Sequence, residues 1–139
     1  MKLCNDTITV FNARVDPDLG GNVWVPTVIT GVSWFATDSS TVDAGKGGLV
    51  AANKATIRIP VEADTGGKQY TDPVSYASAE DVSRLWTLKG GDIVVKAAVE
   101  GADCTPAKLK KAYADCVTVL GVTDNRRAPR APHWRITGT

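Results

Sequence analysis

The sequence predicts a mainly β domain, a small β-barrel or sandwich with one appended α-helix and long loops. Residues 86–98, WTLKGGDIVVKAA, and residues 55–61, ATIRIPV, both alternate apolar and polar side chains. Such alternation places one face of a strand in the core and the other in water. Several further short strand patterns accompany a single clear helix pattern. We favour the barrel, because closing a sheet removes its exposed edges.

The first third of the chain contains two strand patterns separated by a turn. Residues 7–11 alternate apolar and polar positions, and residues 14–22 contain Asp-Pro-Asp and Gly-Gly, which is turn chemistry. Residues 23–35, VWVPTVITGVSWF, are rich in β-branched and aromatic side chains. Because Pro26 cannot donate a ladder hydrogen bond, we expect two strands or one bent strand there. Residues 36–48, ATDSSTVDAGKGG, are polar and contain glycine, and we expect a mobile loop.

The middle of the chain contains the clearest alternation. In residues 55–61, Ile57 and Ile59 point one way and Arg58 points the other. Residues 62–72 are polar and predict a loop, and residues 73–85 predict a short helix or an irregular crossing. For residues 86–98 we expect a hairpin that folds back at the Lys-Gly-Gly-Asp turn.

The C-terminal third combines the helix, one more strand and a basic segment. Thr105 is a good N-cap, and Pro106 suits the first helical position, where its missing N–H has no partner to lose. Leu109 and Tyr113 then share one side of the helix. Residues 116–122, CVTVLGV, predict a strand, and residues 125–139 predict an extended C-terminal segment.

The composition limits the function classes. A length of 139 residues fits one domain over residues 1–139. With Lys plus Arg at 16 and Asp plus Glu at 15, no overall basic field favours nucleic acid. The three cysteines are odd in number and lack CxxC spacing, which argues against a disulfide framework and a zinc site. The sequence shows neither a signal-peptide pattern nor an apolar run long enough to cross a bilayer, so we expect a cytoplasmic setting.

Three motifs suggest catalysis, and each lacks its context. The triplet at Asp64 matches aspartic proteases, but that chemistry needs a buried loop and a second Asp, and the neighbours here are polar. Residues 45–48, GKGG, lack the spacing of a phosphate loop. His133 is the only histidine, and no spacing brings a nucleophile to it. We therefore predict no catalytic residue, metal or cofactor, and a hydrolase using Asp64 or His133 is the alternative.

The basic segment is the sharpest local charge feature. No acid occurs in residues 126–135, which include Arg126, Arg127, Arg130 and Arg135. Arginine and tryptophan together are typical of interface hot spots, and Trp134 lies within this run. Protein–protein contact is our first interpretation of the segment. A solvated tail in which Trp134 adds a strand is the second, and DNA contact is the third.

The order of these patterns resembles a known group of proteins. A strand over residues 7–12 is followed by a strand region ending in Gly-Val-Ser-Trp, a long loop, ATIRIPV, a Tyr-Pro region, and WTLKGGDIVVK. The C-terminal stretches VLGVTDNRR and HWRITG complete the pattern. The chain resembles a family of small proteins from the head-morphogenesis region of tailed phages and prophages of Gram-positive bacteria. The element order is also similar to that of head-closure (stopper) proteins, which are small β-barrels.

This resemblance implies a structural virion protein at the head-tail junction, not an enzyme, assembled in the host bacterial cytoplasm. It implies a homo-oligomeric ring that contacts the portal or adaptor protein and tail proteins, with transient passage of double-stranded DNA and no membrane. The loop over residues 36–48, with Asp38, Asp43 and Lys46, would face the channel or a neighbouring ring. The basic segment, with Trp134, would contact the next subunit. The helix near residues 105–114 departs from the stopper pattern, so a tail terminator or minor capsid protein is an alternative, and a nucleic-acid-binding module is another.

Overall fold

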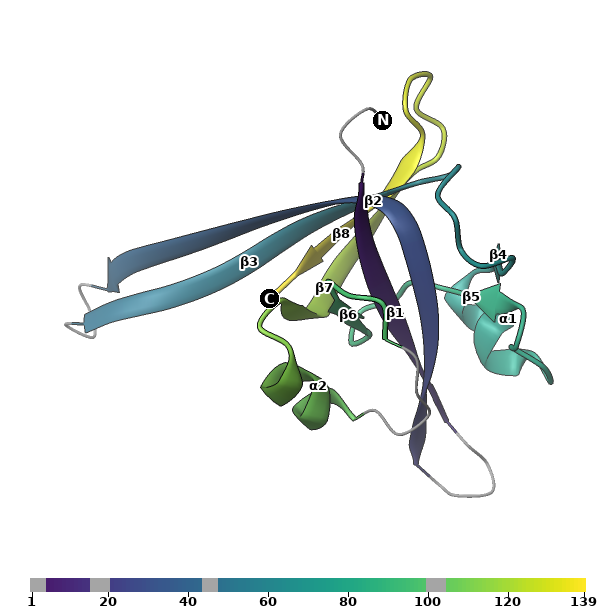
Figure 1. Cartoon of the computed structure of the whole chain (residues 1–139), viewed down its shortest axis with the longest axis horizontal. Coiled ribbons are helices and arrows are strands. Elements are labelled where there is room, and N and C mark those ends of the chain that lie inside the picture. The colour runs from purple at the N-terminus through teal and green to yellow at the C-terminus, as the bar shows by residue number, and fades with distance from the viewer. Residues whose placement is uncertain (1–4, 16–20, 44–47, 100–104) are drawn as a thin grey trace.

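The chain folds into a closed antiparallel β-barrel, as the computed structural model shows (Figure 1). The structure describes residues 5–15, 21–43, 48–99 and 105–139, and for residues 22, 37–43 and 48–53 it describes the backbone only. The barrel order is β1-β2-β3-β8-β7-β6. The bounds of these strands are β1 Asp6–Val15, β2 Asn22–Asp43, β3 Gly48–Pro60, β6 Ile93–Val95, β7 Cys116–Asn125 and β8 His133–Gly138. The predicted mainly β fold is confirmed, and the closed barrel replaces the sandwich alternative.

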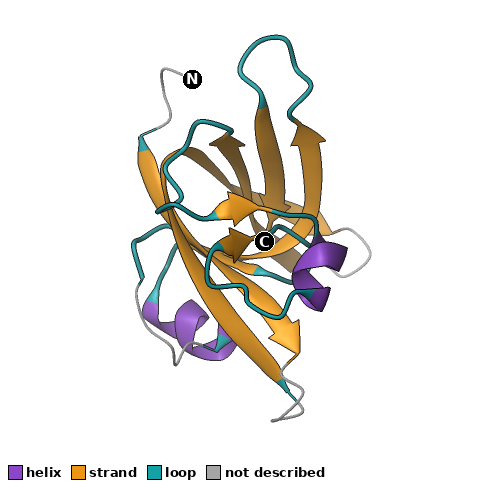
Figure 2. Cartoon of the chain, turned by 90° about the vertical axis from the view of Figure 1, so that its right-hand side faces the viewer, coloured by secondary structure: helices purple, strands orange, loops and turns teal. Residues whose placement is uncertain are grey.

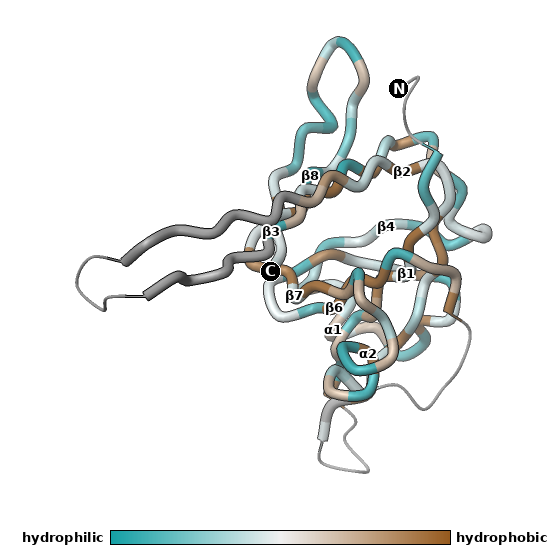
Figure 3. The backbone as a smooth tube through the Cα atoms, turned by 60° about the vertical axis from the view of Figure 1, so that its left-hand side comes forward, coloured by the Kyte–Doolittle hydropathy of each residue, from teal (hydrophilic) through white to brown (hydrophobic). Residues whose placement is uncertain are grey.

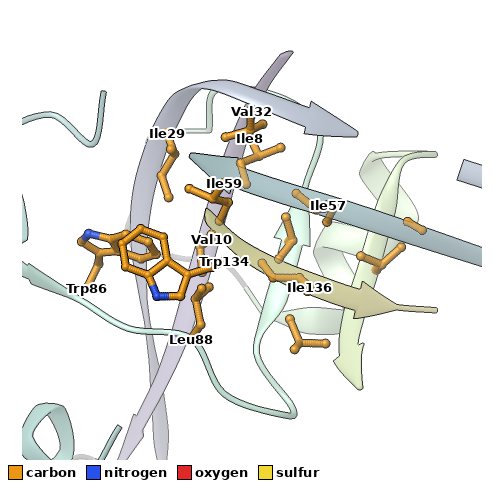
Figure 4. Close-up of a cluster of buried hydrophobic side chains, with 14 residues drawn as sticks. Ile8, Val10, Ile29, Val32, Ile57, Ile59, Trp86, Leu88, Trp134 and Ile136 are labelled. Atoms are coloured by element: carbon orange, nitrogen blue, oxygen red, sulfur yellow. The ribbon is translucent and has the colours of Figure 1, made fainter. Parts of the chain in front are cut away.

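The core fills the inside of the barrel (Figure 4). The period of two in each strand sends alternate side chains inward, so Ile57 and Ile59 of β3 lie beside Trp134 and Ile136 of β8. Ile8 of β1 joins the same cluster from across the barrel. Figure 4 shows these side chains converging between the strands. The barrel interior is therefore a packed core and not a channel.

Two short helices lie outside the barrel wall (Figure 2). The predicted helix is α2, Pro106–Ala112, and the Thr105 hydroxyl accepts the Lys108 N–H at 3.4 Å. Leu109 is buried in a second apolar cluster, against which Tyr113 packs. For residues 73–85 a short helix or an irregular crossing was expected, and the structure has a short helix there, α1, Pro73–Ser78. Among the described residues, neither helix is long and apolar enough to span a membrane.

The loop expected over residues 36–48 is wrong for residues 36–43 and 48, which form strands, and residues 44–47 lie outside the described residues. Strand β2 continues to Asp43 and β3 starts at Gly48, with a regular register from Ala36↔Ala55 to Asp43↔Gly48. A hairpin satisfies the backbone groups that a loop of this length would leave to water. The first strand of this part of the hairpin, residues 37–43 (TDSSTVD), carries a polar sequence. That composition is what made it resemble a loop.

For residues 86–98 the expected Lys-Gly-Gly-Asp turn forms, with the Asp92 N–H donating to the Lys89 carbonyl at 3.3 Å, but the expected pairing of the two halves as a hairpin is wrong. Its first half is β5, Leu85–Trp86, which pairs in parallel with β4, Gln69–Tyr70. Its second half, β6, pairs instead with β1 and β7. A buried side chain of β1 contacts the residues between β5 and β6. The Asn12 amide donates to the Thr87 carbonyl at 2.6 Å and to the Asp92 carboxylate at 2.8 Å, so it ties this segment to β1.

The C-terminal segment is part of the barrel wall. Strand β8 lies between β3 and β7 and closes the barrel, with Ile136 paired to Ile57 on one side and to Val122 on the other. Near its end, a Cβ added to Gly138 would approach the Val117 side chain to 2.8 Å, so this strand position requires glycine. Figure 3 shows the apolar stretches of the chain within the barrel strands and a largely hydrophilic loop between β7 and β8.

Candidate interaction surfaces

The most prominent surface feature is a two-stranded projection, which we call the arm and define as residues 37–54. Strand β1 pairs with β2 only as far as Val32, and β8 pairs with β3 only from Ala55. Beyond these points β2 and β3 pair only with each other among the described residues, and they project away from the barrel (Figure 1). Seven residues per strand extend roughly 23 Å. Both outer edges of the arm therefore carry unpaired backbone donors and acceptors.

The residues predicted to face a channel or a neighbouring ring fall on this arm. Asp38 pairs with Asn53 in the register, and Asp43 pairs with Gly48 at the far end. Their side chains lie outside the described ones, and Lys46 lies outside the described residues altogether. The role of all three stays a prediction, and for Asp38 and Asp43 the structural setting changes from a loop to a β-strand.

The predicted basic segment is divided between the barrel core and the surface. Trp134 is only 6% exposed, and its ring centroid lies 4.7 Å from that of Tyr70 and 5.1 Å from that of Trp86. The isolated chain thus holds this ring inside the barrel instead of presenting it as an anchor. At this residue the structure agrees with the second of our three interpretations, in which Trp134 adds a strand to the sheet.

The Arg126 side chain is held by contacts with other residues of the same chain. Its guanidinium donates to both oxygens of Asp124, at 2.9 Å from Nε to Oδ1 and 2.6 Å from an Nη to Oδ2. It also lies over the rings of Tyr70 and Trp134, 5.0 and 5.3 Å from their centroids. The hydrogen bonds from Arg126 lower the pKa of the Asp124 carboxyl below its ordinary value. Arg127 and Arg130, on the same loop between β7 and β8, are exposed.

Arg135 has a neighbour that sequence reasoning did not single out. It stands directly opposite Arg58 in the β3–β8 register, and both side chains are exposed on the outside of the barrel. Within the described part of the chain, neither guanidinium forms an ion pair. Phe35 lies on the same outer face of the sheet. It is on β2, two positions beyond Ser33, the register partner of Arg58, and is 63% exposed. We call Phe35, Arg58 and Arg135 the basic face.

The sequence predicts the outward direction of Arg58 on this face but not its pairing with Arg135. The alternation in β3 predicts that Arg58 points away from Ile57 and Ile59, and the structure confirms it. The register between β3 and β8 is not visible from the sequence, because the two strands are far apart in the chain. Only that register brings Arg58 and Arg135 together.

The residues considered for catalysis do not converge on a reactive arrangement. Asp64 is exposed, its backbone pairs with Thr30 at 2.9 and 3.0 Å, and its Oδ1 accepts the Gly66 N–H at 2.9 Å. His133 contacts the Ala131 carbonyl through Nδ1 at 2.7 Å and the Asn125 amide through Nε2 at 3.3 Å. These are the contacts of a turn and a strand end. Among the described residues, no group of three or more His, Cys, Asp or Glu side chains could hold a metal ion.

The buried carboxylate of Asp92 is the other acid of interest. Its oxygens accept from the Asn12 amide at 2.8 Å and the Ala13 N–H at 3.1 Å, and Lys89 Nζ lies 3.2 Å away. Burial raises the pKa of this carboxyl above its ordinary value, against the opposing effect of these hydrogen bonds. The contacts with Asn12 and Ala13 join β1 to the turn before β6, and the contact with Lys89 lies within that turn, so the group has a structural role.

The comparisons with known proteins give one family. A model described as a family of unknown function, DUF6751, matches residues 3–139. No curated protein and no solved structure matches the chain.

Proposed function

We propose that this chain, which belongs to the DUF6751 family of unknown function, is a structural protein of the phage head-tail junction. In this proposal it is a head-closure or other neck-ring component that joins the portal or adaptor complex to the tail. The proposal starts from the resemblance of its strand order and motifs to small phage head-morphogenesis and head-closure proteins. The closed barrel agrees with the architecture that this resemblance implies.

The observation that carries the proposal is the arm on a closed barrel. A two-stranded ribbon without further support is marginally stable in water. Its unpaired edges also invite pairing with another chain, a liability that soluble proteins normally cover. A protein that retains such an arm is therefore suited to ordered assembly, in which a neighbour supplies the missing contacts. In a neck ring, that neighbour is the next subunit or the next ring.

Because the barrel interior is packed, DNA could not pass through a single chain, and this supports a ring of several copies. Side chains such as Ile8, Ile57 and Ile136 fill the barrel and are fully buried. Double-stranded DNA would then pass through a central opening between copies of the chain. A head-to-tail contact between unlike surfaces is the kind that closes a ring. The barrel would form the ring body, and the arm would face the channel or the next ring.

A tail terminator or a minor capsid protein remains the alternative within this class. In this proposal the three roles differ in the neighbours that the arm meets. Localisation within the particle separates them. A chain at the portal-proximal neck supports head closure, and a chain at the end of the tail tube supports a terminator.

The test is to look for the chain in purified particles. We expect peptides of this protein in mature virions of its parent phage, and cryo-EM density for the barrel in a ring at the head-tail junction. Its absence from mature virions would overturn the proposal. Asp64→Ala and His133→Ala provide a second test. If particles assemble normally with both variants while a hydrolytic activity disappears, the protein is an enzyme and the structural proposal is wrong.

A further inference from the structure

We propose that the basic face of one copy binds the acidic α1 segment, residues 72–81, of a second copy. This inference rests on the proposed function, because it names the contact between subunits that would close the ring.

The basic face has an electrostatic reason to be covered. Arg58 and Arg135 are directly opposite each other across β3 and β8. Like charges at opposite positions on one face of a sheet repel and destabilise the pair. Inside the described chain, no carboxylate forms an ion pair with either guanidinium. A carboxylate from outside would relieve the repulsion and use the planar donor forks of both arginines.

Phe35 gives the same face an apolar centre. Ser33 is the register partner of Arg58, and Phe35 follows it by two positions, so its ring lies on the same side of the sheet. The ring is 63% exposed, although it belongs to a strand whose inward positions are buried. An exposed aromatic next to arginines is the composition found at interface hot spots. The face therefore suits a partner that carries both an apolar side chain and carboxylates.

The α1 segment has the complementary composition. Between Lys68 and Arg84 the chain contains three acids, Asp72, Glu80 and Asp81, and no lysine or arginine. All three are exposed, and Val74, on the first turn of α1, is 78% exposed. The segment thus exposes an apolar side chain on its helix and carboxylates at both ends of that helix, whereas the basic face exposes an aromatic ring and two guanidinium groups.

The segment is also fixed to the barrel, which a subunit contact requires. Tyr76 buries its ring from the inner side of α1. The Arg14 guanidinium of β1 donates to the Ala79 carbonyl at the C-terminal end of the helix. The Asp72 carboxylate caps the N-terminal end by accepting the Ser75 N–H at 3.0 Å. The helix is therefore held at both ends, and its outer side is presented in one orientation.

The two surfaces lie on different parts of the molecule. Phe35 is at the base of the arm, and α1 lies on the side of the barrel away from the arm (Figure 1). Pairing unlike surfaces of identical chains gives a heterologous contact, which closes into a ring when the rotation allows. The balance of 16 basic against 15 acidic residues fits a chain whose charges are complementary between copies.

The test is a charge swap with the full chain. One variant is Arg58→Glu with Arg135→Glu, and the other is Glu80→Lys with Asp81→Lys. We expect the wild type to self-associate in sedimentation velocity, more weakly at high salt. Each double variant should self-associate at least about tenfold more weakly, because like charges then meet at the contact. An equal mixture of the two should associate again, since each variant restores the charge that the other has lost.

The matched control is Lys96→Glu with Lys111→Glu, two exposed lysines outside the proposed contact. It changes the net charge as much as the basic-face variant and should leave association unchanged. A wild type that stays monomeric, a double variant that associates like the wild type, or a mixture that stays dissociated would each overturn the inference. A basic-face variant that loses only binding to duplex DNA would also overturn it, in favour of a phosphate-binding face.

Particle analysis and the charge swap together distinguish a wrong subunit contact from a wrong neck role. If virions contain the chain and both charge variants assemble into them normally, the subunit contact is wrong and the neck role stands. If the charge swap restores self-association but virions lack the chain, the contact stands and the neck role is wrong.

Discussion

The barrel and the arm are built from the same two long strands, yet different interactions hold them. Within the barrel, β2 and β3 each have strands on both sides and one face over the core. In the arm they have only each other among the described residues. Burial of apolar area is the main favourable term in folding, and the arm lies beyond the core that supplies it. The difference indicates that the barrel provides stability, and our proposal assigns contact with other molecules to the arm.

The largest effect should come from the barrel core. We expect Trp134→Ala to lower the free energy of unfolding by about 3–5 kcal/mol, because it removes a buried ring and leaves a cavity beside Trp86 and Tyr70. Chemical denaturation measures this change. Phe35→Ala is the exposed aromatic control and should stay within about 0.5 kcal/mol of the wild type. Equal losses for both would show that Phe35 also supports the fold.

The next effect concerns the buried amide that redirects residues 86–98. We expect Asn12→Ala to cost about 2–3 kcal/mol, because the Thr87 carbonyl and the Asp92 carboxylate each lose a buried donor. Asn125→Ala, a half-buried amide with one side-chain contact at His133, is the control and should cost less than about 1 kcal/mol. A neutral Asn12→Ala would mean that this amide does not hold β1 to the turn before β6.

A smaller, pH-dependent effect belongs to the loop at the barrel end. Because Arg126 lowers the pKa of Asp124, the folded state binds fewer protons there than the unfolded state. Its contribution is then complete above the ordinary value near 3.8 and is lost as pH falls through the folded pKa. Both side chains are about half exposed, so we expect less than about 1 kcal/mol.

Unfolding of Asp124→Asn and of the wild type across this pH range measures that contribution. The difference in free energy should be constant at higher pH and shrink as the acid range is entered. Asp92, whose pKa is raised by burial, acts in the opposite direction, but it is present in both proteins and cancels. A difference that does not change with pH would contradict the assignment to the Arg126 pair.

The smallest effect on stability should come from removing the arm. Ala36 and Ala55 are register partners, so a two-residue Asn-Gly turn in place of residues 37–54 closes the hairpin at the barrel wall. We expect the free energy of unfolding to change by less than about 1 kcal/mol. The same variant should fail to enter virions. A large loss of stability would show that the arm supports the barrel, and normal incorporation would show that it is not an assembly element.

Local patterns in the sequence predicted the elements that depend on neighbours in the chain. The alternation at Ile57, Arg58 and Ile59 sets which side faces the core, because successive strand residues point to opposite faces. Thr105 and Pro106 predict the start of α2, because a cap acts within one turn. The errors arose where partners are distant. Residues 37–43 of β2 are polar like a loop, yet they pair with β3, and residues 87 and 92 are bound by Asn12 of β1, which is far away in the chain.

By itself the sequence determined that this protein is a β-rich domain with one capped helix and a cluster of arginines near its end. The tertiary structure decided what those residues can do. It placed Trp134 inside and Arg135 outside, brought Arg58 beside Arg135, and extended β2 and β3 beyond the barrel. The physical reason is that side-chain direction is a local property of a strand. The neighbours of a strand depend on register and closure among segments far apart in the chain.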